Sequence, residues 1–471
     1  MFRRNPTKPT ADEIQELFES SPPDAGFLNA SPSSPPSPAR QVQFSSEPVK
    51  SGENGILRSQ STSNIDTDAR LNRELKRMLS IHSVVSTAST AARAHDEAQS
   101  RGAQTYKKIG AGACGAIFAQ DGKSVVVKVA KGNELELWND YLMHAKIADA
   151  FREFDIASIR VPKYYYYSPR MNESFFDQNP GLKAAAAPFC NFPTAALLTE
   201  RILPLPKNTR GCLIDKFCDP NPAMRASARA DPANHDCLVR VYLGLPRGWG
   251  TGRFFSLRNF KLHLNQMVEL DLNVHDFAHR MGDAMAIMHW AAETDARDVE
   301  FALGSASKAV PLSATSREIE RMAPCTYTGP ESRVTEDFFH RATELWVLDF
   351  NQVKHITMDE EGVAAAVNAA MINDPYIPKP NAETEVGQKI WEAFCAAYLR
   401  TAEKILQKKD PESALAYMMG LDTYLFDLPQ KFLDGLIEAH KAKSSSQGSQ
   451  TSMDCNVSGS QGSRASTTSP T

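Results

Sequence analysis

The spacing of hydrophobic and polar positions changes along the chain and divides it into four zones. The first zone is mostly polar, apart from apolar residues at helical spacing near 68–84. The second carries short β-branched runs typical of strands, and the third carries longer runs typical of helices. The fourth is polar again. The zones cover residues 1–100, 104–205, 206–442 and 443–471.

The first and last zones are predicted to be disordered tails. They are rich in Ser, Pro, Gly and Gln, and such segments bury too little apolar surface to offset the entropy lost on ordering. The Ser-Pro repeats of Ser31–Pro38 could accept phosphate from proline-directed kinases and so recruit protein partners. The alternative is a plain disordered tail.

The two middle zones predict an α+β fold. Val125–Val129 is a β-branched strand preceded by the hairpin signal Asp121-Gly122, and Ala195–Leu203 is a second apolar strand. Leu135–Phe151 has the apolar spacing of a helix. A strand-rich part followed by a helical part is typical of α+β proteins. Further helices are predicted at Val274–Ala292, Met358–Met371, Glu385–Gln407 and, with breaks, Pro411–His440.

Composition narrows the class of protein. The 52 basic and 56 acidic residues give a formal net charge of -4, so we expect neither nucleic acid nor an anionic membrane as a partner. The 8 cysteines are irregularly spaced, unlike a secreted disulfide framework. No secretory signal follows Met1, and the most apolar stretch, Ala184–Leu198, is broken by prolines. A cytoplasmic or nuclear protein is expected.

The glycines Gly110, Gly112 and Gly115 form the pattern G-x-G-x-x-G. Glycines at such spacing let the backbone approach phosphate groups closely. The residues that follow predict a strand rather than the helix of a dinucleotide-binding turn, so a glycine-rich loop over nucleotide phosphates fits better. A Gly/Ala loop without a ligand is the alternative.

Lys128 lies within the apolar run V-V-V-K-V-A. A buried lysine is unfavourable unless it is paired, so an acidic partner is expected on the next helix. Asp140 is the first candidate, and Glu136, one turn earlier, is the second. An exposed lysine on an edge strand is the alternative.

In this order, the glycine loop, the lysine strand and the acidic helix resemble protein kinases. Leu197–Leu203 resembles the hinge between the two kinase lobes, which implies that Glu200 belongs to the nucleotide-binding residues. The resemblance implies a divergent two-lobed protein-kinase-like fold, with an N-lobe at 104–205 and a helical C-lobe at 206–442. Insertions are expected near 206–273 and 304–340.

The segment Glu293–Leu303 resembles the kinase catalytic loop H-R-D-x-x-x-x-N. The resemblance puts Asp295 at the catalytic aspartate, which accepts the proton of the acceptor hydroxyl, and Glu300 at the metal-binding asparagine. Glu293 and Thr294 replace His and Arg. Glu300 can still hold Mg²⁺, but its added negative charge opposes a triphosphate.

Leu345–Asn351 resembles the D-F-G segment of kinases, which implies that Asp349 bridges Mg²⁺ to the phosphates of ATP. Asn351 replaces the glycine, and asparagine tolerates a positive φ better than most residues. This stretch and Val299–Gly304 also resemble a fungal family of unknown function, whose members often carry names such as zinc-finger-like protein. That family has no established activity, so it implies no reaction.

Zinc is a less favoured cofactor. Cys212, Cys218, His235 and Cys237 offer three sulfurs and an imidazole, a ligand set that zinc accepts. Their spacing, C-x5-C-x16-H-x-C, is not that of a usual finger, and free cysteines are often buried apolar groups.

Three functions follow from the sequence. The favoured hypothesis is a divergent nucleotide-binding or pseudokinase-type interaction module, because Glu300 and the missing His-Arg weaken the catalytic motif. The first alternative is an active ATP/Mg²⁺-dependent phosphotransferase. The second is a zinc-binding protein. The sequence identifies neither substrate nor partner.

Overall fold

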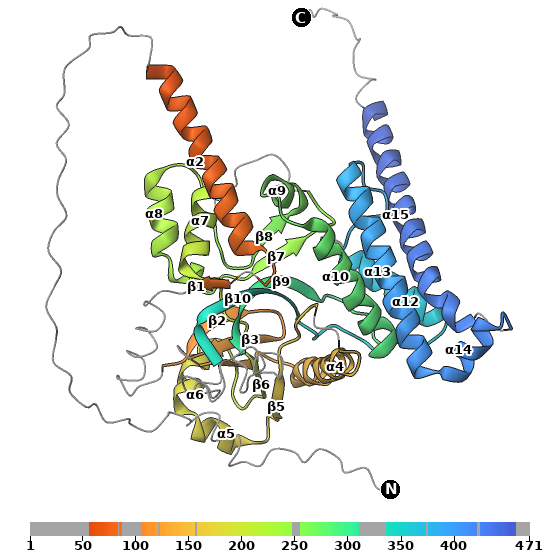
Figure 1. The fold of residues 1–471 in the computed structure, drawn as a ribbon. Helices are drawn as coiled ribbons and strands as arrows, with labels where there is room; N and C mark the ends of the chain where they lie inside the picture. Colours follow the sequence, from red (N-terminus) through yellow and green to blue (C-terminus); the bar gives the residue numbers. More distant parts are fainter. Residues whose placement is uncertain are drawn as a thin grey trace, which may run out of the picture. The chain divides into compact units, whose positions relative to one another are not determined.

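The computed structural model describes residues 56–82, 84–86, 105–120, 123–155, 158–246, 255–309, 336–373, 375–421 and 424–457. The contacts below lie within the unit that begins at Ser59. Its fold is α+β, as predicted, and contains two five-stranded sheets (Figure 1). The Ser-Pro tail Ser31–Pro38 and the turn Asp121-Gly122 lie outside the described residues.

The first sheet is antiparallel throughout and has the strand order β2-β3-β4-β6-β5. Its central strand, β4, buries Val127 and Val129, whereas Lys128 points to the opposite face. The strands are β2 (Lys107–Ala111), β3 (Gly115–Ala119), β4 (Val125–Ala130), β5 (Tyr164–Ser168) and β6 (Ala196–Glu200).

Helix α4 (Glu134–Glu153) packs against this sheet. Asn133 caps it by accepting a hydrogen bond from the Leu135 N–H, which explains where the helix begins. Leu137 is fully buried against Ala130 and Leu197. This packing fixes the rotation of the helix about its axis, and therefore fixes where Asp140 points.

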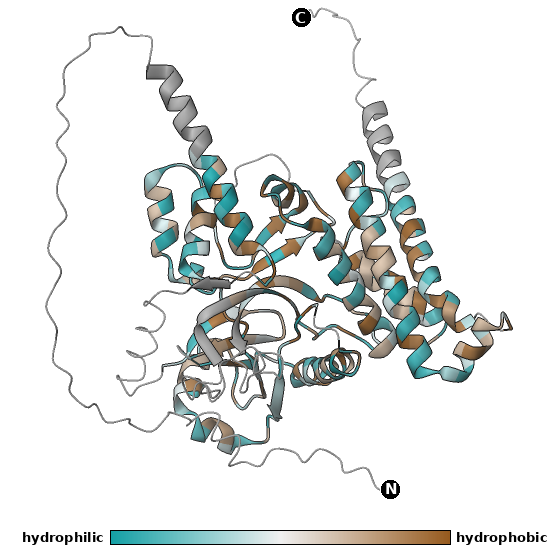
Figure 2. Cartoon of the chain, in the orientation of Figure 1, coloured by the Kyte–Doolittle hydropathy of each residue, from teal (hydrophilic) through white to brown (hydrophobic). Residues whose placement is uncertain are grey.

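The second sheet has the strand order β1-β10-β9-β7-β8. Its centre is the antiparallel pair β9 and β10, in which Leu303 lies opposite Leu345 and Glu300 opposite Leu348. Strands β7 and β8 are parallel, and their hydrophobic residues, which alternate with hydrophilic ones, are buried: Val239, Val241, Phe260 and Leu262 (Figure 2). The strands are β1 (Val84–Ser86), β7 (Val239–Tyr242), β8 (Phe260–His263), β9 (Glu300–Ala309) and β10 (Glu336–Leu348).

The remaining helices surround the main hydrophobic core. Gly282 of α10 lies so close to α13 that a Cβ there would meet Phe394 O at 2.4 Å, so the two helices need a glycine at their crossing. Trp290, Tyr398 and Phe432 fill the core beside it. The helices around this core are α10 (Val274–Ala286), continued by the π-helix η2 (Ile287–Ala291), α12 (Glu360–Ile372), α13 (Glu385–Lys409), α14 (Pro411–Met418) and α15 (Tyr424–Val457).

Two differences from the sequence prediction concern the tails. The helix predicted near 68–84 is α2 (Ile56–Leu79), which begins earlier and ends before strand β1. At the other end, the tail predicted as disordered from 443 onward continues helix α15 to Val457. Two of the apolar residues at helical spacing in this region, Leu75 and Leu79, are fully buried.

The region predicted as an insertion at 206–273 supplies strands β7 and β8 to the second sheet, so it is part of the core. It also contains α7 (Lys207–Phe217), α8 (Pro222–Ala230), the 3-10 helix η1 (Pro232–Asn234) and α9 (Leu264–Glu269). Of the second predicted insertion, 304–340, the described residues extend β9 and β10. Two short helices, α5 (Glu173–Gln178) and α6 (Pro180–Ala186), precede β6.

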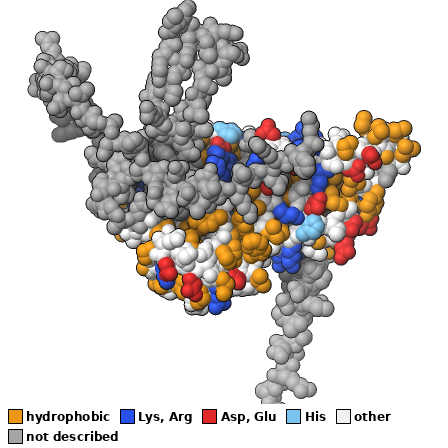
Figure 3. Space-filling view, turned by 90° about the horizontal axis from the view of Figure 1, so that it is seen from below, with side chains coloured by type: hydrophobic (Ala, Val, Ile, Leu, Met, Phe, Trp, Pro, Cys, Tyr) orange, Lys and Arg blue, Asp and Glu red, His pale blue; other side chains and the backbone are white. Residues whose placement is uncertain are grey.

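Among the described residues, no helix is both long and apolar enough to cross a bilayer. Large hydrophobic side chains are nevertheless exposed, and Figure 3 shows hydrophobic groups gathered on the face seen from below. Two regions carry about half of them. On α4 they are Leu135, Trp138 and Leu142, and on α14 and the loop after it they are Leu415, Tyr417, Met418, Met419 and Leu421.

Candidate functional site

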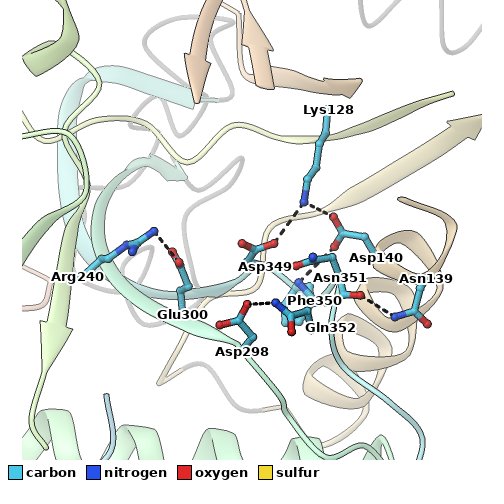
Figure 4. Close-up of polar contacts among 10 residues, drawn as sticks. All are labelled: Lys128, Asn139, Asp140, Arg240, Asp298, Glu300, Asp349, Phe350, Asn351 and Gln352. Atoms are coloured by element: carbon cyan, nitrogen blue, oxygen red, sulfur yellow. Dashed lines mark hydrogen bonds and ion pairs between the residues drawn. The ribbon is translucent and has the colours of Figure 1, made fainter. Parts of the chain in front are cut away.

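Lys128 lies between two carboxylates that come from distant parts of the chain (Figure 4). Its Nζ is 2.6 Å from Asp140 Oδ2 on α4 and 3.3 Å from Asp349 Oδ1 at the end of β10. The lysine side chain is only 13% exposed. The pairing with Asp140 is confirmed, whereas Glu136, the second candidate, is exposed to solvent.

The electrostatic balance keeps this lysine charged. Burial alone would lower the pKa of Lys128, but the carboxylates of Asp140 and Asp349 outweigh burial and raise the pKa well above its ordinary value. The ammonium is therefore a permanent positive charge at physiological pH, suited to an anionic ligand.

The glycine turn joins β2 to β3, as the sequence predicted, and it closes through a hydrogen bond from Gly112 N to Gly115 O of 2.9 Å. Lys131 Nζ donates to Gly112 O at 2.7 Å and holds the turn over β4. A Cβ on Gly115 would lie 2.9 Å from Val129 O and 3.0 Å from Lys128 Cγ. Gly115 is thus needed for the passage of the lysine side chain, a reason that the sequence pattern alone did not reveal.

The other two glycines differ from Gly115. A Cβ on Gly112 would meet nothing within 4 Å, so this position is open. A Cβ on Gly110 would meet the Ile117 side chain at 3.3 Å, so Gly110 belongs to the packing between β2 and β3. Of the three, Gly112 is the exposed one, and its N–H and O are already engaged in the hydrogen bonds of the turn.

Helix α4 also holds the segment that follows Asp349. Asp140 Oδ1 accepts a hydrogen bond from Phe350 N at 3.3 Å. Asn139 Nδ2 donates to Asn351 O at 3.0 Å and to Val353 O at 2.9 Å. Two adjacent residues of one helix therefore fix both the lysine and the backbone beside Asp349.

The positive φ expected at Asn351 falls instead on Asp349, where φ is 67°. The left-handed conformation is one that aspartate tolerates better than most residues, at some cost in energy. Residue 351 is not among those with positive φ, so the tolerance of asparagine for that conformation is not needed there.

Asp295, predicted as the catalytic aspartate, ties together two loops. Its Oδ1 accepts hydrogen bonds from Arg297 N at 3.0 Å and from Lys354 N at 2.9 Å, and its own N–H donates to Lys354 O. The residue is 5% exposed. Burial raises its pKa, while the two backbone N–H groups act in the opposite direction. A part in proton transfer stays a prediction for this residue.

Glu300, predicted as a metal ligand, forms an ion pair with Arg240 of β7, with 2.6 Å between Oε1 and the guanidinium (Figure 4). Burial raises the pKa of Glu300 to about 7, against the opposing effect of Arg240 and with the help of Asp349 and Asp298. The carboxylate predicted to oppose a triphosphate thus has a neighbouring cation, although burial and the nearby acids outweigh that cation in its pKa.

Asp298 is a site residue that the sequence prediction missed. It has a φ of 61°, and its N–H donates to Asn373 Oδ1 at 2.5 Å. Its Oδ2 accepts a hydrogen bond of 2.5 Å from Gln352 Nε2. Burial and the nearby Asp349 carboxylate raise the pKa of Asp298. The only sequence signal was a third acid between the two residues that the motif selected.

Glu200, predicted to bind nucleotide, lies at the end of β6 opposite Val125. Its carboxylate accepts a hydrogen bond from Lys163 N at 2.9 Å, and its N–H donates to Lys163 O at 2.8 Å. Side chain and backbone N–H thus stabilise the sheet edge. Nucleotide binding by this residue stays a prediction.

The four residues of the zinc alternative do not come together as a metal centre. Within the part of the chain that the structure describes, there is no group of three or more His, Cys, Asp or Glu side chains that could hold a metal ion. Cys218 and Cys237 are buried and Cys212 is half-buried, all as free thiols. They behave as the small apolar groups of the alternative interpretation.

One stretch of the chain matches the model of a protein family. Residues 345–410 match the model of a family described as a zinc finger protein and domain of unknown function, DUF3669. The match begins with the predicted Leu345–Asn351 stretch and includes Asp349, but it covers a small part of the chain. No curated protein and no solved structure matches the chain. The stretch 345–410 is thus similar to a zinc finger protein family, although the described residues contain no group able to hold zinc.

Proposed function

We propose that this chain is a divergent, two-lobed kinase-like protein that binds a nucleotide together with Mg²⁺ and serves as a pseudokinase-type interaction module. One observation carries the proposal: Lys128 contacts both Asp140 and Asp349 beside a glycine turn. These groups come from β4, α4 and the end of β10, in the order that the kinase resemblance implies.

The charges of the site favour a ligand that includes a cation. Two basic side chains face four acidic ones, and 2 − 4 leaves a formal charge of -2. Bound Mg²⁺ would supply the positive charge that lets a triphosphate approach these carboxylates. Lys128 would contact the phosphates, and the exposed turn at Gly112, which has no side chain, would cover them. The six charged residues are Lys128, Arg240, Asp140, Asp298, Glu300 and Asp349.

Binding without turnover is favoured because the residues of the catalytic-loop motif have other partners. Thr294 is fully buried and bonds to Met288 O through both its N–H and its hydroxyl. Glu293 forms an ion pair with Lys409. Together with the backbone contacts of Asp295, these interactions support a loop built for stability rather than for proton transfer.

A thermal shift assay with Mg-ATP, combined with a phosphate-release assay, tests the proposal. At 100 times Kd a ligand stabilises the folded state by about 2.7 kcal/mol, so the melting temperature should rise clearly. Lys128→Met should abolish the rise, and Glu136→Gln, which alters an exposed acid nearby, should keep it.

The melting temperature and the phosphate release together distinguish the binding module from the phosphotransferase. A rise in melting temperature without phosphate release supports the binding module. A rise with release that is lost in Asp349→Asn indicates the phosphotransferase instead. No rise with any nucleotide, with or without Mg²⁺, contradicts both.

A further inference from the structure

Helix α4 presents three large apolar side chains to solvent on one stripe. Leu135, Trp138 and Leu142 are 69%, 45% and 42% exposed. They lie three and four residues apart, a spacing that places side chains on the same face of a helix. The face that carries the fully buried Leu137 packs against the first sheet. One face of α4 therefore stabilises the fold, while the other leaves an apolar surface exposed.

Two tyrosine rings hold Trp138 in its orientation within this stripe. Its ring centre lies 5.7 Å from that of Tyr141 and 5.1 Å from that of Tyr167 on β5. Figure 1 shows α4 beside β5, which is an edge strand of the first sheet in the described part of the chain. Aromatic side chains that are fixed in this way and remain half exposed are suited to anchor a protein interface.

We propose that the stripe is the contact surface between two copies of the chain, in which the two α4 helices pack antiparallel around a twofold axis. In a twofold contact the same residues of both copies take part, so every contact occurs twice. Trp138 of each copy packs on Leu142 of the other, and Leu135 packs on Ala145. The proposal does not depend on nucleotide binding.

The charges of α4 match this arrangement. When positions 138 and 142 are level across the axis, positions 134 and 146 are level as well. Glu134 lies in the first turn of α4, and Lys146 is exposed one turn after Leu142. An acid therefore meets a base at both ends of the contact, and the opposed helix dipoles add to the attraction.

A parallel pair of the same helices lacks this match, because Glu134 would then lie beside Glu134 and Lys146 beside Lys146. The stripe is complementary in charge to its own reversed copy, which favours a second chain in the antiparallel arrangement. A single helix face buries less than the about 800 Å² per partner of a standard interface. We therefore expect a weak dimer, with a Kd on the order of micromolar.

Sedimentation velocity of the full chain at about 1 to about 100 μM tests the dimer, since this range spans the expected Kd. The unaltered chain should pass from monomer to dimer as its concentration rises. Trp138→Ala should raise the Kd by about tenfold or more. Met418→Ala is the matched control, because it removes an apolar side chain of α14 that is 76% exposed, and it should leave the Kd within about twofold.

A pair of charge variants tests the antiparallel arrangement. Glu134→Lys and Lys146→Glu each place like charges in both contacts, so each should raise the Kd by about tenfold or more. In an equal mixture of the two variants, one copy carries two acids at these positions and the other carries two bases. Opposite charges then meet at both ends, and the mixture should form a heterodimer about as tightly as the unaltered chain.

The outcomes decide the proposal in each case. A chain that stays monomeric throughout the concentration range overturns it, and so does a dimer that Trp138→Ala leaves unchanged or that Met418→Ala disrupts equally. A mixture that stays monomeric, although both charge variants melt cooperatively, overturns it as well. If Trp138→Ala does not melt cooperatively, the mixture of charge variants decides; if Glu134→Lys does not, the comparison of Trp138→Ala with Met418→Ala decides.

Discussion

Replacing Asp140 by asparagine tests the arrangement of the site without any ligand. The change keeps the size of the side chain and a hydrogen-bonding oxygen for Phe350 N, but it removes the charge that faces Lys128 at 2.6 Å. Breaking a buried ion pair destabilises a protein by about 3–5 kcal/mol, because the remaining charge is left buried. Asp349 still lies 3.3 Å from the ammonium, so we expect the lower end, about 3 kcal/mol.

Two comparisons calibrate this value. The Asp349 side chain is 35% exposed, so its pair with Lys128 is screened by solvent, and Asp349→Asn should destabilise the fold by about 1 kcal/mol or less. Glu136 is exposed on the same helix as Asp140, and Glu136→Gln should change stability by less than about 0.5 kcal/mol. The expected order of destabilisation is therefore Asp140, Asp349, Glu136.

The assay is urea unfolding of the ligand-free chain, followed by tryptophan fluorescence. A double variant sharpens it: if the loss in Asp140→Asn comes from an unpaired buried ammonium, then adding Lys128→Met should restore part of the lost stability. A loss below about 1 kcal/mol in Asp140→Asn, or no recovery in the double variant, would refute the buried pair.

Three further predictions follow from single contacts. Gly115→Ala should destabilise the fold by about 1–3 kcal/mol in urea unfolding, because the new Cβ meets Val129 O. Gly112→Ala should leave stability unchanged and weaken only nucleotide binding. Equal losses of stability in the two variants would contradict this. Asn139→Ala should destabilise by about 1–3 kcal/mol, since two backbone carbonyls lose their donor, and should weaken nucleotide affinity as well. Burial lowers the pKa of His289 to about 3, below its unfolded value of about 6.5, so the unfolded chain takes up the proton first and stability should fall by about 1.4 kcal/mol per unit as pH drops below about 6.5. His289→Asn should flatten this dependence in unfolding curves between pH 7 and pH 5, and an unchanged slope would argue against a neutral buried histidine.

Local signals were sufficient for strands β4 and β6 of the first sheet and for helix α4. The β-branched run of β4 and the capping residue Asn133 determine their elements over short stretches of sequence. The expectation that a buried Lys128 must be paired pointed to an acid on the next helix, and the resemblance to kinases put Asp140 ahead of Glu136. No long-range information was needed for that step.

The second sheet could not be predicted because its strands are defined by their partners. Strands β7 and β8 have four residues each, and their short apolar runs fit a helix as well as a strand. Their pairing with each other, and of β7 with β9, joins parts of the chain far apart in sequence. The contact between Arg240 and Glu300 was therefore hidden, and with it the cation that faces the Glu300 carboxylate.

Asp298 was missed for a reason that concerns backbone geometry. Motif comparison selects residues by their spacing in the sequence. It assumes that the loop has the same backbone conformation as in the family. Here Ala296 and Asp298 both have positive φ, at 51° and 61°, and two such residues redirect the chain within three positions. The Asp298 carboxylate then accepts a hydrogen bond from Gln352, while Asp295 turns to the backbone of Lys354. The spacing of a motif predicts the role of a residue only where the loop has the same backbone dihedral angles as in the family. In divergent loops of this kind, the charges that surround each acid are the better guide to its role.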